Sequence, residues 1–264
     1  MSLVLRENEW ALAAIEKKEL GKSPYETFRR VARYYLDSGM SKSSSRKAVE
    51  DFLLSCVPSA SVVKWSRTID AAMSYASKHP AVEITSVSVS ESELKTIDAI
   101  QSGRQSQRLA FTLLCLAKYW HIRNGCEGDS YWVNNSDSEI MQMANIKTTI
   151  RRQCKLYHDL CEAGLISFSH KIDCNNVKVN FVVDATAKLV IDNFTNLGNQ
   201  YLMYAGEPYF KCAECGVVTK FDPHVSGRKQ KYCSECAAKV VNAQKRAYAI
   251  KTRDADFVEK NRIV

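Results

Sequence analysis

Four cysteines near the C-terminal end constrain the fold of this chain more than any other feature of its sequence. They form two Cys-x-x-Cys pairs, Cys212 with Cys215 and Cys233 with Cys236, and seventeen residues separate the pairs. Each pair can aim two sulfurs at one ion from a tight turn, and four thiolates complete the tetrahedral shell of a structural zinc site. The spacing therefore predicts one structural Zn²⁺ with no open position for catalysis.

The residues around the two pairs indicate the kind of metal finger. Gly216 directly follows the first pair, where such a knuckle commonly needs a left-handed residue. After Cys233 the sequence runs SECAAKVVNAQKRAYAIKTR, which has no turn residues and much Ala, so it predicts a helix that begins at the second pair. A knuckle, a hairpin and a helix that carries the last ligands form the arrangement of a treble-clef finger.

The seventeen-residue spacing and the helix resemble a GATA-type zinc finger over residues 212–253. The resemblance implies that Cys212, Cys215, Cys233 and Cys236 hold the metal. The aromatic and basic stretch of the GATA loop is replaced here by TKFDPHVSGRKQKY. The resemblance therefore implies the metal ligands and no GATA-like base preference.

The other cysteines and the N-terminus indicate the cellular compartment. The six remaining cysteines are Cys56, Cys115, Cys126, Cys154, Cys161 and Cys174. They lie mostly in apolar patterns, where a reducing compartment suits them as small buried hydrophobic residues. The N-terminus carries Glu7 and Glu9 and lacks the features of a signal peptide. The apolar run 109–117 is too short to span a bilayer. We expect a cytoplasmic protein of a bacterium or a phage-infected host cell, with no membrane partner.

The charge of the chain is positive and is concentrated near the C-terminal end. The net charge is +8, and residues 206–264 contain twelve Lys or Arg against seven Asp or Glu. Such an excess favours an anionic partner, and nucleic acid is the default, DNA before RNA. A solvated surface with a modest basic excess is the alternative interpretation.

The first ninety residues predict helices. In the segment 23–39, Ser23 can cap a helix, Pro24 suits the first helical position, Glu26 completes a capping box and Gly39 can end it.

Further elements follow along this N-terminal part. Two more helices are expected over residues 43–56 and 59–79, a short strand over 81–89, and a capping box at Ser90 and Glu93 that opens another helix. We interpret this part as a helical domain that packs on itself or forms a homodimer. A helix-turn-helix is the alternative.

The middle of the chain has the element order of a DNA-binding fold. A polar linker is expected at residues 101–107, followed by a buried helix over 108–123 and a short strand, YWVN. A capping box at Ser136 and Glu139 opens a short helix, and a longer helix with Thr148 as its cap ends at Gly164.

Two strands, LISFSHKI and VKVNFVV, complete this segment. The order helix, strand, helix, helix, strand, strand resembles a winged helix-turn-helix over about residues 105–184. The phrase L-x-x-A-G-L-I between the longer helix and the wing is typical of bacterial regulators and phage replication proteins.

The longer helix is the candidate recognition helix. Its core-facing residues are expected to be Ile150, Cys154, Tyr157 and Cys161, at spacings of 4, 3 and 4. The residues then left to face DNA are Thr149, Arg151, Arg152 and Lys155. The wing turn adds Lys171, Asn175, Asn176 and Lys178. Winged helices also serve as protein-interaction modules, so this role stays open.

The basic residues of the finger have two interpretations. A zinc ion with four thiolates carries a formal charge of −2, which Lys211, Arg228, Lys229 and Lys231 can offset. Of these, Arg228, Lys229 and Lys231 are also candidate nucleic-acid contacts. The basic residues of the following helix, available for phosphates, are Lys239, Lys245, Arg246, Lys251 and Arg253.

No catalytic motif accompanies these features. The sequence has no phosphate-binding Gly-rich loop and no H-E-x-x-H, and none of its five histidines lies close to another. A nuclease with a histidine-metal finger would use His224 with further His or Asn on the helix, which here offers only Asn242. We therefore expect a protein that is not an enzyme.

The sequence as a whole predicts a mainly α protein with small β elements. The expected domains are a helical domain at 1–100, a winged helix at 105–195 and a zinc finger with a basic helix at 205–264. The favoured function is nucleic-acid binding in regulation or replication, as in phage or mobile-element proteins. The alternative is an inhibitor or adaptor, possible in a phage, that docks its basic surfaces on a host nucleoprotein machine or nuclease.

Overall fold

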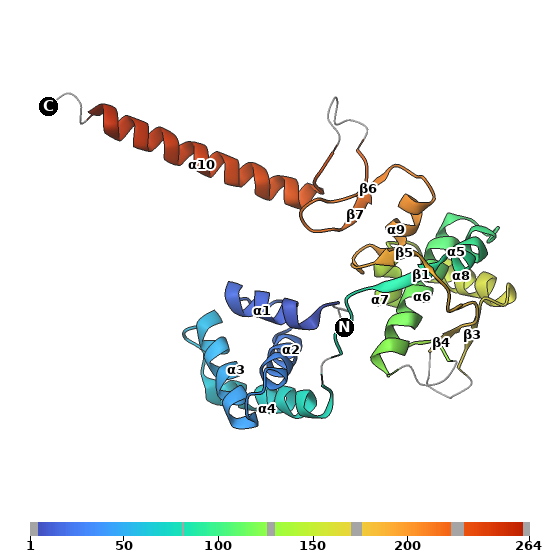
Figure 1. Cartoon of the computed structure of the whole chain (residues 1–264), viewed down its shortest axis with the longest axis horizontal. Helices are drawn as coiled ribbons and strands as arrows, with labels where there is room; N and C mark the ends of the chain where they lie inside the picture. The colour runs from blue at the N-terminus through green and yellow to red at the C-terminus, as the bar shows by residue number, and fades with distance from the viewer. Residues whose placement is uncertain (1–4, 81, 126–129, 170–175, 223–229, 261–264) are drawn as a thin grey trace. The chain divides into compact units, whose positions relative to one another are not determined.

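The structure is a computed structural model that describes residues 5–80, 82–125, 130–169, 176–222 and 230–260 (Figure 1). It is mainly helical with small antiparallel sheets, as expected. The chain forms two compact units, each built from three stretches of sequence. Unit 1 contains Met1–Glu93, Cys115–Asn134 and Phe168–Phe194, and unit 2 contains Leu94–Leu114, Asn135–Ser167 and Thr195–Val264. The expected division into domains at 1–100, 105–195 and 205–264 stays a prediction.

Four helices form the helical part of unit 1. They are α1 (Glu7–Lys17), α2 (Pro24–Asp37), α3 (Lys42–Cys56) and α4 (Val62–Lys78). Their apolar faces meet around Phe28, whose ring makes edge-on contacts with Phe52 and Trp65. Leu53 and Ile69 are fully buried in the same cluster. Helices of this length gain most of their stability from such packing of one apolar face.

The start of α2 differs from the expected capping box. Ser23 is the N-cap residue and Pro24 is the first helical residue, but the Ser23 side chain makes no capping hydrogen bond. Glu26 instead accepts a hydrogen bond of 2.6 Å from the guanidinium of Arg29, which is 4% exposed. A buried cation needs its counter-charge more than the helix end needs a second cap. Gly39 ends the helix as expected, with φ +83°.

Three arginines of α2 are buried, and two of them form ion pairs with the carboxylate of Glu7. Both carboxylate oxygens of Glu7 accept hydrogen bonds from Arg33, at 2.6 and 2.8 Å, and Arg30 and Arg123 approach the same carboxylate to 3.8 Å. Burial lowers the pKa of Arg30, and Glu7 opposes this effect. These guanidinium groups can be buried because the one carboxylate of Glu7 serves several of them.

Unit 1 also contains the predicted capping box at Ser90 and a strand that is shorter than the one expected over residues 81–89. Strand β1 (Val87–Ser90) pairs antiparallel with β5 (Ala187–Ile191). Helix α5 (Glu91–Asp98) begins with the expected box, since the Ser90 amide donates to the Glu93 carboxylate at 2.7 Å and the Glu93 amide donates to Ser90 Oγ at 3.3 Å.

The middle elements occur in the predicted order. They are α6 (Arg104–Arg123), β2 (Trp132–Val133), α7 (Asp137–Met143), α8 (Ile150–Glu162), β3 (Ile166–Phe168) and β4 (Val177–Val179). The strands form a sheet in the order β2-β4-β3, with Trp132 opposite Lys178. The Ser136–Glu139 capping box is confirmed.

Two local expectations for these elements are wrong. Helix α6 begins at Arg104, so it takes in part of the expected linker, because Ser106 and Gln107 are buried and Gln107 bonds to the carbonyls of Asp98 and Ile100. Helix α8 is capped by Thr149 and not by Thr148, since Thr149 Oγ1 accepts a hydrogen bond from the Arg152 amide.

The last elements are α9 (Leu197–Tyr204), β6 (Tyr209–Lys211), β7 (Val218–Lys220) and α10 (Ser234–Lys260). The sequence pattern had not indicated α9. It packs against the hairpin of β6 and β7 and buries Tyr201, whose hydroxyl donates to Asp98 at 2.8 Å.

Helix α9 also lies against the turn between α7 and α8. A Cβ atom placed on Gly198 would lie 2.3 Å from the carbonyl oxygen of Ala144, so only glycine fits. The buried Asn199 accepts a hydrogen bond from the Asn145 amide group at 3.1 Å and donates to the Val218 carbonyl at 3.0 Å. Arg108 donates to the Ala144 carbonyl at 2.7 Å. These contacts join α6, α9, the turn and the hairpin.

We expect Gly198→Ala to lower the free energy of unfolding by about 2 kcal/mol, because the added methyl meets backbone. The sign of this change is diagnostic. Without a clash, replacing a helical Gly by Ala would raise the free energy of unfolding by up to about 1 kcal/mol. Urea unfolding followed by circular dichroism measures the change. An unchanged or higher midpoint would contradict the close approach of α9 to Ala144.

Candidate metal centre and nucleic-acid interface

The first cysteine pair lies on the knuckle between β6 and β7. The Cys212 amide donates to the Val217 carbonyl at 3.0 Å, and the Gly216 amide donates to the Cys212 carbonyl at 3.0 Å. Gly216 has φ +69°, so the predicted left-handed residue is present. This tight turn brings Cys215 back toward Cys212.

The second pair lies at the start of α10. Cys233 directly precedes the helix, and Cys236 is in its first turn. The Cys233 amide donates to Cys212 Sγ at 3.3 Å, and the Ala213 amide donates to the Lys231 carbonyl at 2.9 Å. These two hydrogen bonds hold the knuckle and the helix start together.

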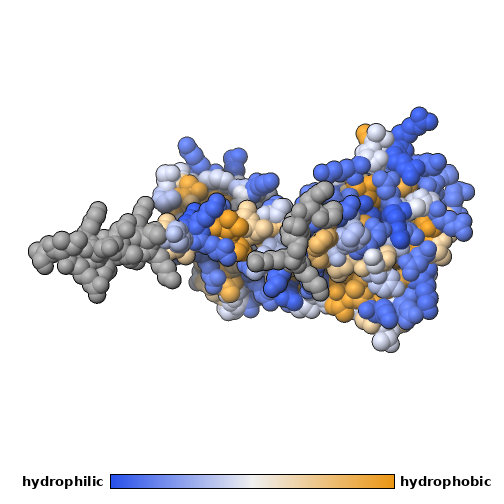
Figure 2. All heavy atoms as spheres, turned by 90° about the horizontal axis from the view of Figure 1, so that it is seen from above, coloured by the Kyte–Doolittle hydropathy of each residue, from blue (hydrophilic) through white to orange (hydrophobic). Residues whose placement is uncertain are grey.

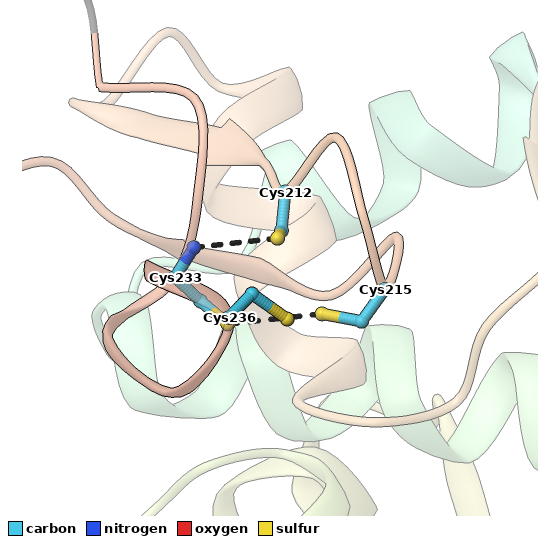
Figure 3. A group of neighbouring side chains, drawn as sticks. All are labelled: Cys212, Cys215, Cys233 and Cys236. Atoms are coloured by element: carbon cyan, nitrogen blue, oxygen red, sulfur yellow. Dashed lines mark hydrogen bonds between the residues drawn. The ribbon is translucent and has the colours of Figure 1, made fainter. Parts of the chain in front are cut away.

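The four thiol groups converge on one point (Figure 3). All four Sγ atoms lie within 4.8 Å of one another, and Cys215 Sγ and Cys233 Sγ are 3.7 Å apart. Sulfurs at tetrahedral corners about 2.3 Å from zinc would be about 3.8 Å apart, whereas a disulfide needs about 2.05 Å. The donor set and its spacing fit one tetrahedral metal ion, and zinc is the ion that four thiolates suit best.

The surrounding amides favour ionised sulfur at Cys212. Burial opposes ionisation of Cys212, but backbone N–H groups, first that of Cys215 and then that of Cys233, outweigh it and lower the pKa of Cys212 to about 6. The pKa of Cys236 is raised to about 12, chiefly by its hydrogen bond with the Cys233 thiol. Four adjacent thiols without a metal thus share protons, and a divalent cation can replace those protons and hold all four as thiolates.

The other cysteines only partly match the expectation of burial. Cys115 is buried, and burial raises the pKa of its thiol. Cys56 and Cys161 are half-buried, but Cys154 is exposed, so its predicted core position is wrong. Cys126 and Cys174 lie outside the described residues.

The core-facing side of α8 also differs from the prediction. Its buried residues are Leu156, Tyr157 and Leu160, whereas Ile150 is 78% exposed. The predicted and observed faces share Tyr157, but the two leucines draw the buried stripe to their side because they bury more apolar area than cysteine. One side of the first turns of α8 is therefore exposed.

The predicted nucleic-acid contacts on α8 lie in these first turns. Thr149, Arg151 and Lys155 are exposed. Arg152 is half-buried, and its Nε donates to Gln105 Oε1 at 3.4 Å, so it is less available than its neighbours.

The other predicted contacts are distributed over several elements. Lys178 is half-buried in β4, and Asn176, which directly precedes this strand, is also half-buried. Lys231, Lys239, Lys245 and Arg246 are exposed. Outside the described residues lie Lys171, Asn175, Arg228, Lys229 and also His224. The structure does not test whether any of these residues binds nucleic acid.

Comparison with known proteins gives no relative. No protein-family model matches the chain, and no curated protein and no solved structure matches it. None of the helices within the described residues is long and apolar enough to cross a membrane. The function must therefore be inferred from the residues themselves.

We expect the purified protein to contain about one zinc per chain and Cys233→Ser to lose it, with unfolding of the hairpin and the start of α10. Cys154→Ser is the matched control, because that thiol is exposed and lies outside the cluster. Elemental analysis and circular dichroism measure the two effects. Equal metal content in both variants, or a metal-free protein with a folded hairpin, would contradict the assignment.

Proposed function

We propose that the protein is a non-catalytic, double-stranded-DNA-binding protein whose middle segment is a winged helix with α8 as its recognition helix. The observation that carries the proposal is the exposed N-terminal half of α8. Leu156, Tyr157 and Leu160 anchor the helix through its second half, so Arg151 and Lys155 project from the first half. Recognition helices present this end to the major groove.

The chemistry of this exposed end suits DNA. An arginine can donate two hydrogen bonds to the O6 and N7 of guanine, and Lys155 can contact a phosphate. The order of α6, β2, α7, α8, β3 and β4 supports the winged-helix assignment, with the sheet of β2, β4 and β3 as the wing. Lys178 on β4 stays a candidate contact to the DNA backbone.

The metal finger has a supporting role in this proposal. We assign it to the treble-clef type, since a knuckle and a helix start supply the four cysteines. Its metal is zinc, and the finger orients α10, whose Lys245 and Arg246 are exposed and suit phosphate contacts. A role in regulation or replication, in a phage or its bacterial host, fits a protein that combines these parts.

The first test is the salt dependence of binding. Wild-type affinity for a duplex should fall steeply as salt rises. Arg151→Ala with Lys155→Ala should reduce the slope of log K against log salt by about 1, because the phosphate contact of Lys155 is removed, and should weaken binding further through loss of the Arg151 contact to guanine. Lys64→Ala with Arg67→Ala removes the same charge from an exposed surface of α4 and is the matched control. Fluorescence anisotropy gives both slopes.

The proposal fails if the protein binds no duplex at any salt concentration, or if both double variants change the slope equally. The second result would mean that net charge, and not α8, determines binding.

A second test concerns Ile150, which points to solvent beside Arg151. An exposed apolar side chain at this position suits the methyl group of thymine. In a DNA site obtained by selection, replacing the contacted thymine by uracil should weaken wild-type binding about fourfold, as expected for one buried methyl group. The same replacement should have no effect on Ile150→Ala. An equal effect on both proteins would remove Ile150 from the interface.

A further inference from the structure

Helix α10 has an apolar face for which the described residues provide no cover. The helix has 27 residues, and only its first turn belongs to the metal centre, where Cys236 is 6% exposed. From Val241 to Ile250 every residue is exposed. Large apolar side chains reach the surface there, with Tyr248 71% and Ile250 60% exposed, and Figure 2 shows hydrophobic residues among the hydrophilic ones on the face drawn.

The apolar residues of α10 follow the spacing of a helix-pairing surface. Val240, Ala243, Ala247 and Ile250 are separated by three, four and three residues, the spacing of the a and d positions of a coiled coil. We call these four residues the apolar seam. An isolated helix is marginally stable in water and is normally supported by packing of such a stripe. The seam therefore fits another helix that lies along it.

The charges beside the seam select the kind of partner. Lys239 and Arg246 each directly precede a seam residue, at positions that flank a paired helix, and Lys245 is also exposed. By sequence, residues 239–253 contain five cations and no carboxylate. Two copies of this segment would bring like charges together, whereas a helix with Asp or Glu at its flanking positions would bring opposite charges together.

Nucleic acid would provide partners for the cations of this surface and none for its apolar residues. Phosphates would pair with the cations of α10, but the sugar-phosphate backbone would leave the apolar seam in water. A partner that covers both must be apolar on one stripe and acidic beside it.

We propose that α10 is a docking helix for an acidic amphipathic helix of a partner protein, which covers the apolar seam and pairs with Lys239 and Arg246. This surface is distinct from the exposed end of α8, so docking on α10 does not depend on DNA binding by α8. The partner helix would compete with phosphates for Arg246.

A designed peptide tests the proposal with the full-length, zinc-loaded protein. The probe is a synthetic peptide of about 28 residues, four heptads, with Leu at the a and d positions and Glu at the flanking positions. Its counterpart has Lys in place of each Glu. Fluorescence anisotropy should show binding of the Glu peptide and at least about tenfold weaker binding of the Lys peptide.

Two variants distinguish an effect of the apolar seam on peptide binding from an effect of net charge. Ala247→Glu places a carboxylate in the seam, and Ala249→Glu makes the same substitution about 200° around the helix. Both residues are exposed, so neither variant should unfold the protein. Ala247→Glu should weaken binding of the Glu peptide at least about tenfold, whereas Ala249→Glu should weaken it less than about threefold.

Three results would overturn the proposal. The first is equal binding, or no binding, of the Glu and Lys peptides. The second is equal weakening by Ala247→Glu and Ala249→Glu, which would mean that charge alone acts and would favour nucleic acid as the occupant. The third is a protein dimer in sedimentation that Ala247→Glu dissociates, which would make a second copy the occupant.

Discussion

The side chain of Asn199 makes the hydrogen bonds on which the arrangement of unit 2 depends. It is 2% exposed, accepts a hydrogen bond from the side chain of Asn145 and donates one to the carbonyl of Val218. Asn145 lies in the turn before α8 with a left-handed φ of +52°, and Val218 lies on β7 beside the metal centre. A buried amide left without either partner would cost about 1–3 kcal/mol, so the turn and the hairpin are held to the same helix.

The hydrogen bonds of Asn199 connect the finger to the turn that precedes α8, so the finger helps to position this helix. The metal would hold the knuckle against the start of α10, the hairpin packs on α9, and α9 approaches Ala144 so closely that position 198 must be glycine. Arg108 adds a charge-assisted hydrogen bond to the same turn from α6. In our account the metal stabilises the hairpin, and the hairpin in turn supports the turn from which α8 begins. If α8 binds DNA as we propose, the metal would act on that binding through structure, without touching DNA.

The features predicted correctly from the sequence are those that short-range chemistry determines. Each Cys-x-x-Cys pair, the boxes at Ser90 and Ser136 and the helix ends at Gly39 and Gly164 depend on neighbours within a few residues. The meeting of the two cysteine pairs joins residues 18 and 21 positions apart, and the ligand spacing of a metal site made it predictable. The capping box at Ser23 fails because Glu26 is engaged by a buried Arg29, and helix periodicity alone does not predict that burial. Long-range partners therefore account for this error.

Two further errors have related causes. The buried face of α8 was assigned through Ile150 and Cys154, although a stripe through Leu156 and Leu160 fits the same period with larger apolar side chains. Helix α9 was missed because it has only eight residues and buries polar Asn199 and Gln200, which break the apolar pattern. The polar residue that most organises unit 2 is thus one that hydrophobic patterning cannot detect.

Hydrogen exchange measured by mass spectrometry, with and without removal of the metal by a chelator, tests the central claim most directly. If the finger supports the α8 turn through Asn199, metal removal should reduce amide protection in the hairpin and also in α9 and at Ile146, whose amide donates to the Met141 carbonyl at 2.9 Å. Loss of protection confined to residues 209–236, with α9 and Ile146 unchanged, would show that the finger is an independent appendage and would contradict the account.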